Sequence, residues 1–340
     1  MPSLKSEVNE IEGVGQIKID VPFGVKFVSS YIFEIDNKTI LIDAGLNSKS
    51  WIKIFLERLK DLKKTIADID VCIITHSHID HIGLMGVLRK KNPDAKIYMH
   101  NITQKILEWE TDKSNLEDIE QQAIKLSHQF TRYGLSEDQR KRIVQFFTYW
   151  PKLRNYQKPD GVLHDGNIIL KNLEIIWTPG HSFGHICVFN RDKKHLFSGD
   201  HVLSRITPHI GNFMVPEFIT KQYNNYNFSN VLDQYLQSLD RINDLNVRVI
   251  FPGHQEIIYN PQERINQIKD HHDKRLADIS KVIKDKPMTP YRISKIHFGE
   301  DLDEINSFLA LSEVLGHLLY LEDKEQVKTI EKNGQILYYS

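Results

Sequence analysis

The sequence contains little cysteine, no long apolar run and no excess of charge of either sign. Its two cysteines among 340 residues, Cys72 and Cys187, each lie in an apolar, strand-like run. They are expected to be buried thiols in a reducing compartment, because two cysteines are too few for a disulfide scaffold. No apolar run approaches the length of a membrane span, and the polar start MPSLKSEVNE does not resemble a secretory signal. We therefore expect a cytoplasmic protein.

The near-neutral charge balance also limits the classes of partner. A formal net charge of -1 predicts no general attraction to nucleic acid or to an anionic membrane. The chain is 40% hydrophobic and 26% charged, which provides enough apolar surface for a sizeable core. Its length fits one large domain, alone or with a small appendage.

Strand-like and helical segments alternate along the chain, which predicts an α/β fold. Strands are expected within 15–43, 70–75, 96–100 and 167–199, and from 248 to 251. Helices are expected after the capping residue Ser48, through the aromatic-rich stretch 101–160, where Ser136 and Gln139 form a capping box, and from 229 to 244.

The last part of the sequence has a different outline. A long helix is predicted over 261–284, followed by helices at 290–298 and 305–321 and by a hairpin turning at Asn333-Gly334. This order is typical of a winged-helix-like α+β domain. We therefore predict a catalytic domain at 1–260, with a helical insertion at about 101–165, and a C-terminal domain at 261–340.

Sixteen histidines are the unusual feature of the composition, and several of them are grouped. The strand ending at Thr75 runs directly into His76-Ser77-His78-Ile79-Asp80-His81. Because alternate residues of an extended segment share a side, His76 and His78 can reach one ion. Where the chain turns, Asp80 and His81 can point to a neighbouring ion.

Three further clusters each follow a strand-like run and place glycine directly before a candidate ligand. They are Thr178-Pro179-Gly180-His181, Ser198-Gly199-Asp200-His201 and Pro252-Gly253-His254. Glycine lets the backbone turn sharply beside a crowded centre. Ligands at consecutive strand ends converge on one rim of a sheet. The alternative, a coincidental grouping of surface or core residues, is disfavoured by the four clusters occurring together.

The series Asp43 in LIDAG, THSHIDHIG, TPGHSFGH, FSGDH and PGHQE resembles the metallo-β-lactamase superfamily over about 15–260, in the family's order. Its closest branch is that of hydroxyacylglutathione-hydrolase-like proteins. The tail resembles the C-terminal domain of some endoribonucleases and thioesterases of the superfamily. The resemblance implies an αββα sandwich, in which two mixed β-sheets are flanked by helices.

The resemblance also implies a ligand set for two metal ions, expected to be zinc, with iron or manganese as alternatives. His76, His78 and His181 would hold the first ion, Asp80, His81 and His254 the second, and Asp200 would bridge them. Asp43 would accept a hydrogen bond that orients a ligating imidazole. His185 is expected in a structural or supporting role, and His201 in packing.

Imidazole and carboxylate ligands without thiolate suit zinc, iron or manganese. Two such ions ~3.5–4 Å apart activate a bound water and polarise the oxygen of the group that it attacks. The leading hypothesis is hydrolysis of a small-molecule thioester, ester or lactone by a metal-bound hydroxide, with Asp80 and His81 in catalytic roles. Alternatives are a phosphodiesterase or endoribonuclease, a mononuclear-iron sulfur dioxygenase, and a non-catalytic scaffold.

Segments outside the motifs yield weaker candidates. Arg205 and His209, which follow the predicted bridging aspartate, are candidates for substrate contact, with a loop anchored by hydrogen bonds as the alternative. The insertion could form a lid or an extra core layer. From residue 286 onward the tail has six Lys and Arg against nine Asp and Glu. This balance argues against nucleic acid and favours packing, homodimer formation or shaping of the site.

Overall fold

The computed structural model describes residues 4–211, 215–224, 226–284 and 286–340. The chain forms two compact units that are interleaved in sequence, whereas the sequence analysis expected consecutive domains. The first unit comprises 1–111, 153–208 and 241–264, and the second comprises 112–152, 209–240 and 265–340. Much of the predicted insertion thus groups with the C-terminal part.

The interleaving has a physical cause in the second unit. The apolar faces of helices α4 (Leu116–Arg132) and α5 (Glu137–Tyr149) share a core with helix α10 (Glu304–Asp323). The buried members of this core are Leu126, Phe130, Tyr133, Leu135, Ile143, Leu311 and Leu315. Segments far apart in sequence therefore bury one another's apolar side chains. A sequence pattern gives the apolar face of each helix but not its partner.

The first unit contains a seven-stranded sheet in the order β1-β2-β3-β4-β5-β6-β7. Its first four strands are antiparallel, and β4 to β7 run parallel. The strands are β1 (Ser6–Ile11), β2 (Val14–Asp20), β3 (Phe27–Ile35), β4 (Lys38–Ile42), β5 (Val71–Ile74), β6 (Lys96–His100) and β7 (Gly161–Leu163). The sequence analysis did not predict β1 or β7.

A second sheet of five strands has the order β12-β11-β10-β9-β8, with β11 and β12 parallel and the other pairs antiparallel. The strands are β8 (Ile168–Ile169), β9 (Leu173–Trp177), β10 (Ile186–Asn190), β11 (His195–Gly199) and β12 (Val249–Pro252). The two sheets bury a common core in which Tyr31 and Phe33 of the first sheet meet Phe197 of the second. The predicted sandwich of two mixed sheets is confirmed.

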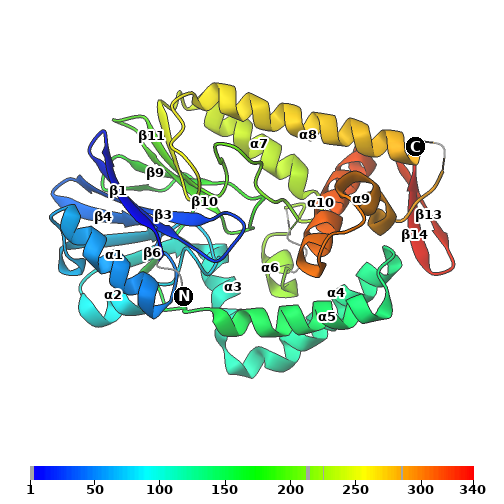
Figure 1. Cartoon of the computed structure of the whole chain (residues 1–340), viewed down its shortest axis with the longest axis horizontal. Coiled ribbons are helices and arrows are strands. Elements are labelled where there is room, and N and C mark those ends of the chain that lie inside the picture. Colours follow the sequence, from blue (N-terminus) through cyan, green and yellow to red (C-terminus); the bar gives the residue numbers. More distant parts are fainter. Residues whose placement is uncertain (1–3, 212–214, 225, 285) are drawn as a thin grey trace. The chain divides into compact units, whose positions relative to one another are not determined.

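Helices cover the outer face of the first sheet. Helices α1 (Lys49–Asp61) and α2 (Met85–Lys91) lie along this face (Figure 1), and helix α3 (Asn101–Thr111) follows β6. Trp51 and Phe55 of α1 are fully buried against the sheet, and their rings stack. Ser48 caps α1 by accepting a hydrogen bond from the backbone N–H of Trp51, at 3.2 Å. This is the helix start that the sequence predicts.

The C-terminal elements of the second unit match their predicted order. Helix α8 (Pro261–Ile283) is followed by α9 (Pro290–Phe298), α10 and a hairpin of β13 (Lys328–Lys332) and β14 (Gln335–Tyr339). Thr289 caps α9 and Ser136 forms its capping box with Gln139, both as predicted. Two further helices are α6 (Glu217–Gln222), which was not predicted, and α7 (Val231–Asp244). No helix of the described ranges is long and apolar enough to cross a membrane.

Both thiols are inaccessible in the folded first unit, which gives a testable prediction. Cys72 and Cys187 have exposed fractions of zero. Burial raises the pKa of both thiols, that of Cys187 to about 12, so the reactive thiolate is scarce at mildly alkaline pH. We expect no rapid reaction of the native protein with a chromogenic thiol reagent and reaction of both thiols after denaturation in guanidinium. Fast stoichiometric labelling of the native protein would contradict the described core.

Candidate metal centre

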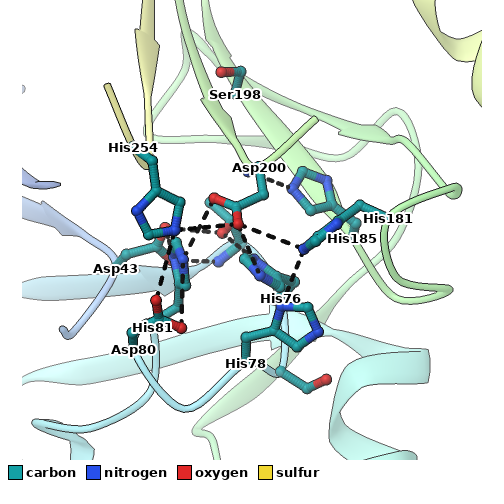
Figure 2. A network of polar contacts seen from close by, with 12 residues as sticks. Asp43, His76, His78, Asp80, His81, His181, His185, Ser198, Asp200 and His254 are labelled. Carbon is teal, nitrogen blue, oxygen red and sulfur yellow. Dashed lines mark hydrogen bonds and ion pairs between the residues drawn. The ribbon is translucent and has the colours of Figure 1, made fainter. Parts of the chain in front are cut away.

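The structure brings together all seven side chains that the sequence analysis assigned to metal binding (Figure 2). They come from four chain segments, each directly after a strand. His76, His78, Asp80 and His81 follow β5 of the first sheet, while His181 follows β9, Asp200 follows β11 and His254 follows β12 of the second sheet. The site therefore lies at an edge where the strand ends of both sheets meet.

One group consists of His76, His78 and His181 together with Asp200. The Nδ1 atom of His78 lies 3.0 Å from Nε2 of His181. The Nε2 atoms of His181 and His76 lie 3.5 and 3.9 Å from Oδ2 of Asp200. His76 is fully buried, and the other two imidazoles are partly exposed. Three imidazoles and a carboxylate oxygen thus surround one point.

A second group consists of Asp80, His81 and His254. The Oδ2 atom of Asp80 lies 3.6 Å from Nε2 of His254, and its Oδ1 atom lies 4.0 Å from Nε2 of His81. All three side chains are buried. Asp200 also reaches this group, since its Oδ1 atom is 3.4 Å from Nε2 of His81 and its Oδ2 atom is 3.3 Å from Nε2 of His254. Asp200 lies between the two groups, as the predicted bridge requires.

The outer nitrogens of the imidazoles are held by hydrogen bonds that turn the Nε2 atoms toward the centre. The Nδ1 atom of His81 lies 2.7 Å from Oδ2 of Asp43, and the Nδ1 atom of His254 lies 2.5 Å from the carbonyl oxygen of Phe27. With Nδ1–H donating to these oxygens, the Nε2 atom of each ring points inward and would offer its lone pair to a cation once it is deprotonated. Asp43 thus contacts a clustered imidazole, as the sequence analysis expected.

Thr75 extends the role of Asp43 to a second imidazole. The hydroxyl of Thr75 donates to Oδ2 of Asp43 at 2.8 Å and lies 3.0 Å from Nδ1 of His76. The backbone N–H of Thr75 also donates to Asp43, at 2.8 Å. One buried carboxylate therefore orients His81 directly and His76 through a hydroxyl. The sequence analysis did not assign a role to Thr75, although it directly precedes the histidine motif.

The unsatisfied atoms of the centre fit a bound cation. The Nε2 atoms of His76 and His81 and the Oδ1 atom of Asp200 are buried without a hydrogen-bond partner. Buried polar atoms are rarely left unsatisfied, and these three converge and can each act as a metal ligand. A cation is the partner that can satisfy several converging lone pairs at once. The residues therefore fit divalent metal ions.

The electrostatics of the centre agree with this fit. Burial, reinforced by the neighbouring imidazoles, holds the pKa of His76 and His78 well below the usual value, which keeps both rings neutral. Burial opposes charge on His81 too, but Asp43 and Asp200 outweigh it and raise the pKa of His81 to about 10. Against the effect of its burial, His254 and His81 hold the pKa of Asp200 well below its usual range. The carboxylates thus stabilise positive charge between them, which is the second proton of His81 when no cation is bound and would be the cation itself when one displaces that proton.

At two of the positions that precede candidate ligands, only glycine fits, because a Cβ atom would collide with neighbouring side chains. A Cβ atom at Gly253 would lie 2.6 Å from Oδ1 of Asp200 and 2.8 Å from Cε1 of His81. Gly199 has φ +48°, and a Cβ there would lie 2.7 Å from Nε2 of His185. The backbone approaches the centre closely only because these positions have no side chain.

The structure places His185 beside Asp200. Its Nε2 atom accepts the backbone N–H of Asp200 at 3.1 Å, and its Nδ1 atom lies 2.8 Å from the hydroxyl of Thr178. Both ring nitrogens are thereby engaged, and burial holds its pKa well below the usual value. This position suits the supporting role that the sequence analysis expected. His201 is fully buried and its ring lies near that of His185.

The weaker candidates lie in different units. Arg205 belongs to the first unit, where its backbone N–H donates to Gln255 at 2.7 Å. His209 belongs to the second unit, where its Nε2 atom lies 2.9 Å from the hydroxyl of Ser312 and its Nδ1 atom lies 3.5 Å from Glu313. These contacts match the alternative of a loop anchored by hydrogen bonds, and substrate contact by either residue stays a prediction.

A third group of potential ligands, His272, Glu313 and His317, is buried in the second unit. The carboxylate of Glu313 already accepts hydrogen bonds from Arg275 and from the backbone N–H of Ile210, so its charge is offset within the protein. His272 is fully buried, and its Nδ1 atom lies 3.0 Å from Nε2 of His317.

Comparison with known proteins agrees with the fold and shows the family. The sequence model of the metallo-beta-lactamase superfamily matches residues 23–254. The chain is 26% identical to the probable metallo-hydrolase YqjP of Bacillus subtilis over 96% of this chain and 98% of that protein. It is 23% identical to an atrochrysone carboxyl ACP thioesterase of Aspergillus fumigatus over 73% of this chain and 56% of that enzyme.

Solved structures show the same fold. A metallo-beta-lactamase family protein of Thermus thermophilus aligns with a TM-score of 0.74 and 24% identity over 97% of this chain and 99% of that one. A beta-lactamase domain protein of Burkholderia ambifaria aligns with a TM-score of 0.77 and 22% identity over 98% and 94%. Because the family's sequence model covers most of the chain and all seven candidate ligands, the chain belongs to the metallo-beta-lactamase superfamily and is an enzyme of that family.

Proposed function

We propose that the chain is a dinuclear zinc hydrolase that cleaves a small-molecule thioester, with esters and lactones as chemically related substrates. The observation that carries this proposal is the convergence of buried acceptor atoms of His76, His81 and Asp200 that have no hydrogen-bond partner. Such an arrangement is costly in a protein without cations. It is useful in an enzyme that holds two of them.

In this proposal one zinc ion would be held by His76, His78 and His181 and the other by Asp80, His81 and His254, and Asp200 would be within reach of both. The donors are imidazole nitrogen and carboxylate oxygen without thiolate, which suits zinc and also allows iron or manganese. When bound, such a pair of ions supplies Lewis acidity and lowers the pKa of water.

The residues of the chain contribute orientation and proton transfer. The Asp80 carboxylate lies beside His81 and His254, where an oxygen can accept the proton released by an attacking water. Asp43 keeps His81 in one tautomer, with Nε2 turned inward, and Thr75 does the same for His76. The buried surroundings exclude bulk water and strengthen these interactions.

Two observations favour a thioester over a nucleic acid as the substrate. Among the relatives are the Aspergillus fumigatus thioesterase and the thioesterase pkgB of Emericella nidulans, which is 22% identical over 70% of this chain and 48% of that enzyme. The formal net charge of the chain is -1, so it lacks the basic excess that phosphate backbones require. Phosphodiesters and short RNA are therefore included as competing substrates in the test below.

We further propose that α9, α10 and the β13–β14 hairpin form a winged-helix-like element whose role is packing or homodimer formation. The order helix, helix, hairpin supports this assignment, as does the excess of acidic over basic residues after position 286. We also propose a cytoplasmic location, which the two buried free thiols support.

The proposed function is tested by metal content and substrate range together. Elemental analysis of the purified protein is expected to give close to two zinc ions per chain, and the zinc-loaded protein is expected to hydrolyse thioesters faster than phosphodiesters or short RNA. Removal of zinc by a chelator should abolish activity and lower the melting temperature, because bound metal stabilises the folded state. One iron per chain would favour oxidation, and no metal would favour a scaffold.

Replacing Asp80 tests its catalytic role. Asp80→Asn keeps the size of the side chain but removes the charge that holds metal and accepts a proton. We expect kcat/KM for the best substrate to fall at least ~10²-fold while circular dichroism stays unchanged. Asp192→Asn, at an exposed position of the same unit, serves as the control. Turnover near that of the wild type in Asp80→Asn would refute the assigned role.

Gly253 offers a test that leaves every proposed ligand in place. In Gly253→Ala the added methyl group would press on Asp200 and His81, so we expect weaker zinc binding in competition with a chromophoric chelator. Gly24→Ala is the matched control, since a Cβ at Gly24 meets nothing within 4 Å. Equal zinc affinities of the two variants would show that the close backbone approach at Gly253 is unimportant for the centre.

A further inference from the structure

We propose that Arg154 and Asn155 are positioning residues that hold the metal-binding loop from His76 to Gly83 in shape, and that Glu110 fixes Arg154 for this task. This inference rests on the proposed metal-dependent function. It concerns residues of the first unit only. Neither the histidine motif nor its glycines point to these three residues, which lie at the two ends of the segment that the chain inserts between β6 and β7.

Arg154 acts at the beginning of the loop. Its guanidinium donates to the carbonyl oxygen of Ser77, the residue between His76 and His78. The chain bends at His76 and Ser77, so the orientation of the peptide group between the two ligands sets the direction in which both side chains leave the backbone. Fixing the Ser77 carbonyl therefore fixes the spacing of the two imidazoles that the proposed first zinc ion requires.

Glu110 holds the guanidinium in place. The Nε atom of Arg154 lies 3.0 Å from Oε2 of Glu110, and the two side chains are only 5% and 7% exposed. Glu110 lies in the last turn of α3. A buried guanidinium needs a counter-charge, and a carboxylate of a helix is a rigid partner. The pair also cancels a positive charge that would otherwise repel a nearby cation.

Asn155 acts at the other end of the loop. Its Nδ2 atom donates to the carbonyl oxygen of Gly83 at 2.7 Å, two residues after His81. Gly83 is also held from its other side, since its N–H donates to the carbonyl oxygen of Gly45 at 2.7 Å. A Cβ at Gly83 would lie 2.2 Å from the backbone nitrogen of Asn47, so the loop end is tightly enclosed. Asp80 and His81 thus lie between two fixed points.

The next residue strengthens the attachment to α3. The hydroxyl of Tyr156 donates to Oε1 of Glu108 at 3.0 Å. Three consecutive residues, 154–156, therefore bond to α3 or to the metal-binding loop. Supporting contacts of this kind orient ligands before metal binding, and their loss typically costs ~10–100-fold in metal affinity.

Arg154→Gln tests the first contact. We expect its zinc dissociation constant to rise ~10–100-fold, the absorption spectrum of the cobalt-substituted protein to change, and kcat to fall more than KM rises. Arg89→Gln is the matched control: Arg89 pairs with Asp160 at 2.7 Å and donates to the Lys158 carbonyl, outside the loop. A zinc affinity and cobalt spectrum of Arg154→Gln equal to those of Arg89→Gln would overturn the role of Arg154.

Asn155→Ala tests the second contact, the hydrogen bond to the Gly83 carbonyl. It also keeps the proposal testable if Arg154→Gln does not fold. We expect a ~10-fold loss of zinc affinity with little change in melting temperature. The control is Asn92→Ala, which removes hydrogen bonds to the carbonyls of Ile66 and Ile69 in the same unit. If Asn155→Ala binds zinc as tightly as the wild type, the positioning role of Asn155 is overturned.

Failure of this inference differs from failure of the proposed function. If the wild-type chain binds zinc tightly and all loop variants bind it equally well, the metal-dependent function stands and the positioning role is refuted. If the wild-type chain binds no metal, both proposals fall. Glu110→Gln adds a third arm, in which an uncompensated guanidinium beside the centre is expected to weaken zinc binding.

Discussion

The gathering of seven potential metal ligands in a largely buried space is the constraint on which the rest of the structure depends. Five imidazoles and two carboxylates, drawn from both sheets, face one another in a largely buried space. Lone pairs gathered in this way destabilise a fold unless positive charge lies among them. The chain must therefore hold these side chains in place before a cation is bound and still leave their inner atoms available to it. Every supporting feature of the site serves one of these two requirements.

Asp43 meets both requirements with one side chain. It accepts hydrogen bonds from Thr75 and lies 2.7 Å from His81, so the outer atoms of the ligands are satisfied and the inner ones are not. Asp43 itself adopts φ +61°, a conformation that few residues besides glycine, asparagine and aspartate tolerate. The chain thus accepts an unfavourable backbone conformation at the end of β4 in order to direct the carboxylate at β5. Glycine would fit the backbone but would provide no acceptor.

Much of the centre could be predicted from sequence because metal ligands obey local rules. Each motif of the centre can be recognised within a few residues of sequence. Examples are the spacing of His76, His78, Asp80 and His81 and the glycines before His181 and Asp200. Their convergence then follows from the rule that strand ends share a rim. Asp43 was also found, since it belongs to a motif of its own. Thr75 also lies within a motif, but threonine is common in strands. The sequence therefore did not indicate that its hydroxyl connects Asp43 to His76.

Other features could not be predicted because they depend on contacts between distant segments. Arg154, Asn155 and Glu110 occur singly in sequence, and only the fold shows that they meet the loop after β5. The grouping of 112–152 with the tail was missed for the same reason. Helical periodicity identifies which face of α4 or α5 is apolar, but the partner of that face depends on the shape of the complete core.

The interleaving of the two units gives the Arg154–Asn155 contact a particular value. The chain leaves the first unit after Thr111, forms α4 and α5 in the second unit, and returns at Leu153. Glu110 and Arg154 pair across the base of this excursion, so its two ends are joined within the first unit. The base is also the point at which the chain contacts the metal-binding loop, through Arg154 and Asn155. Arg154 therefore takes part in both contacts, since it pairs with Glu110 to close the insertion and donates to the loop at Ser77.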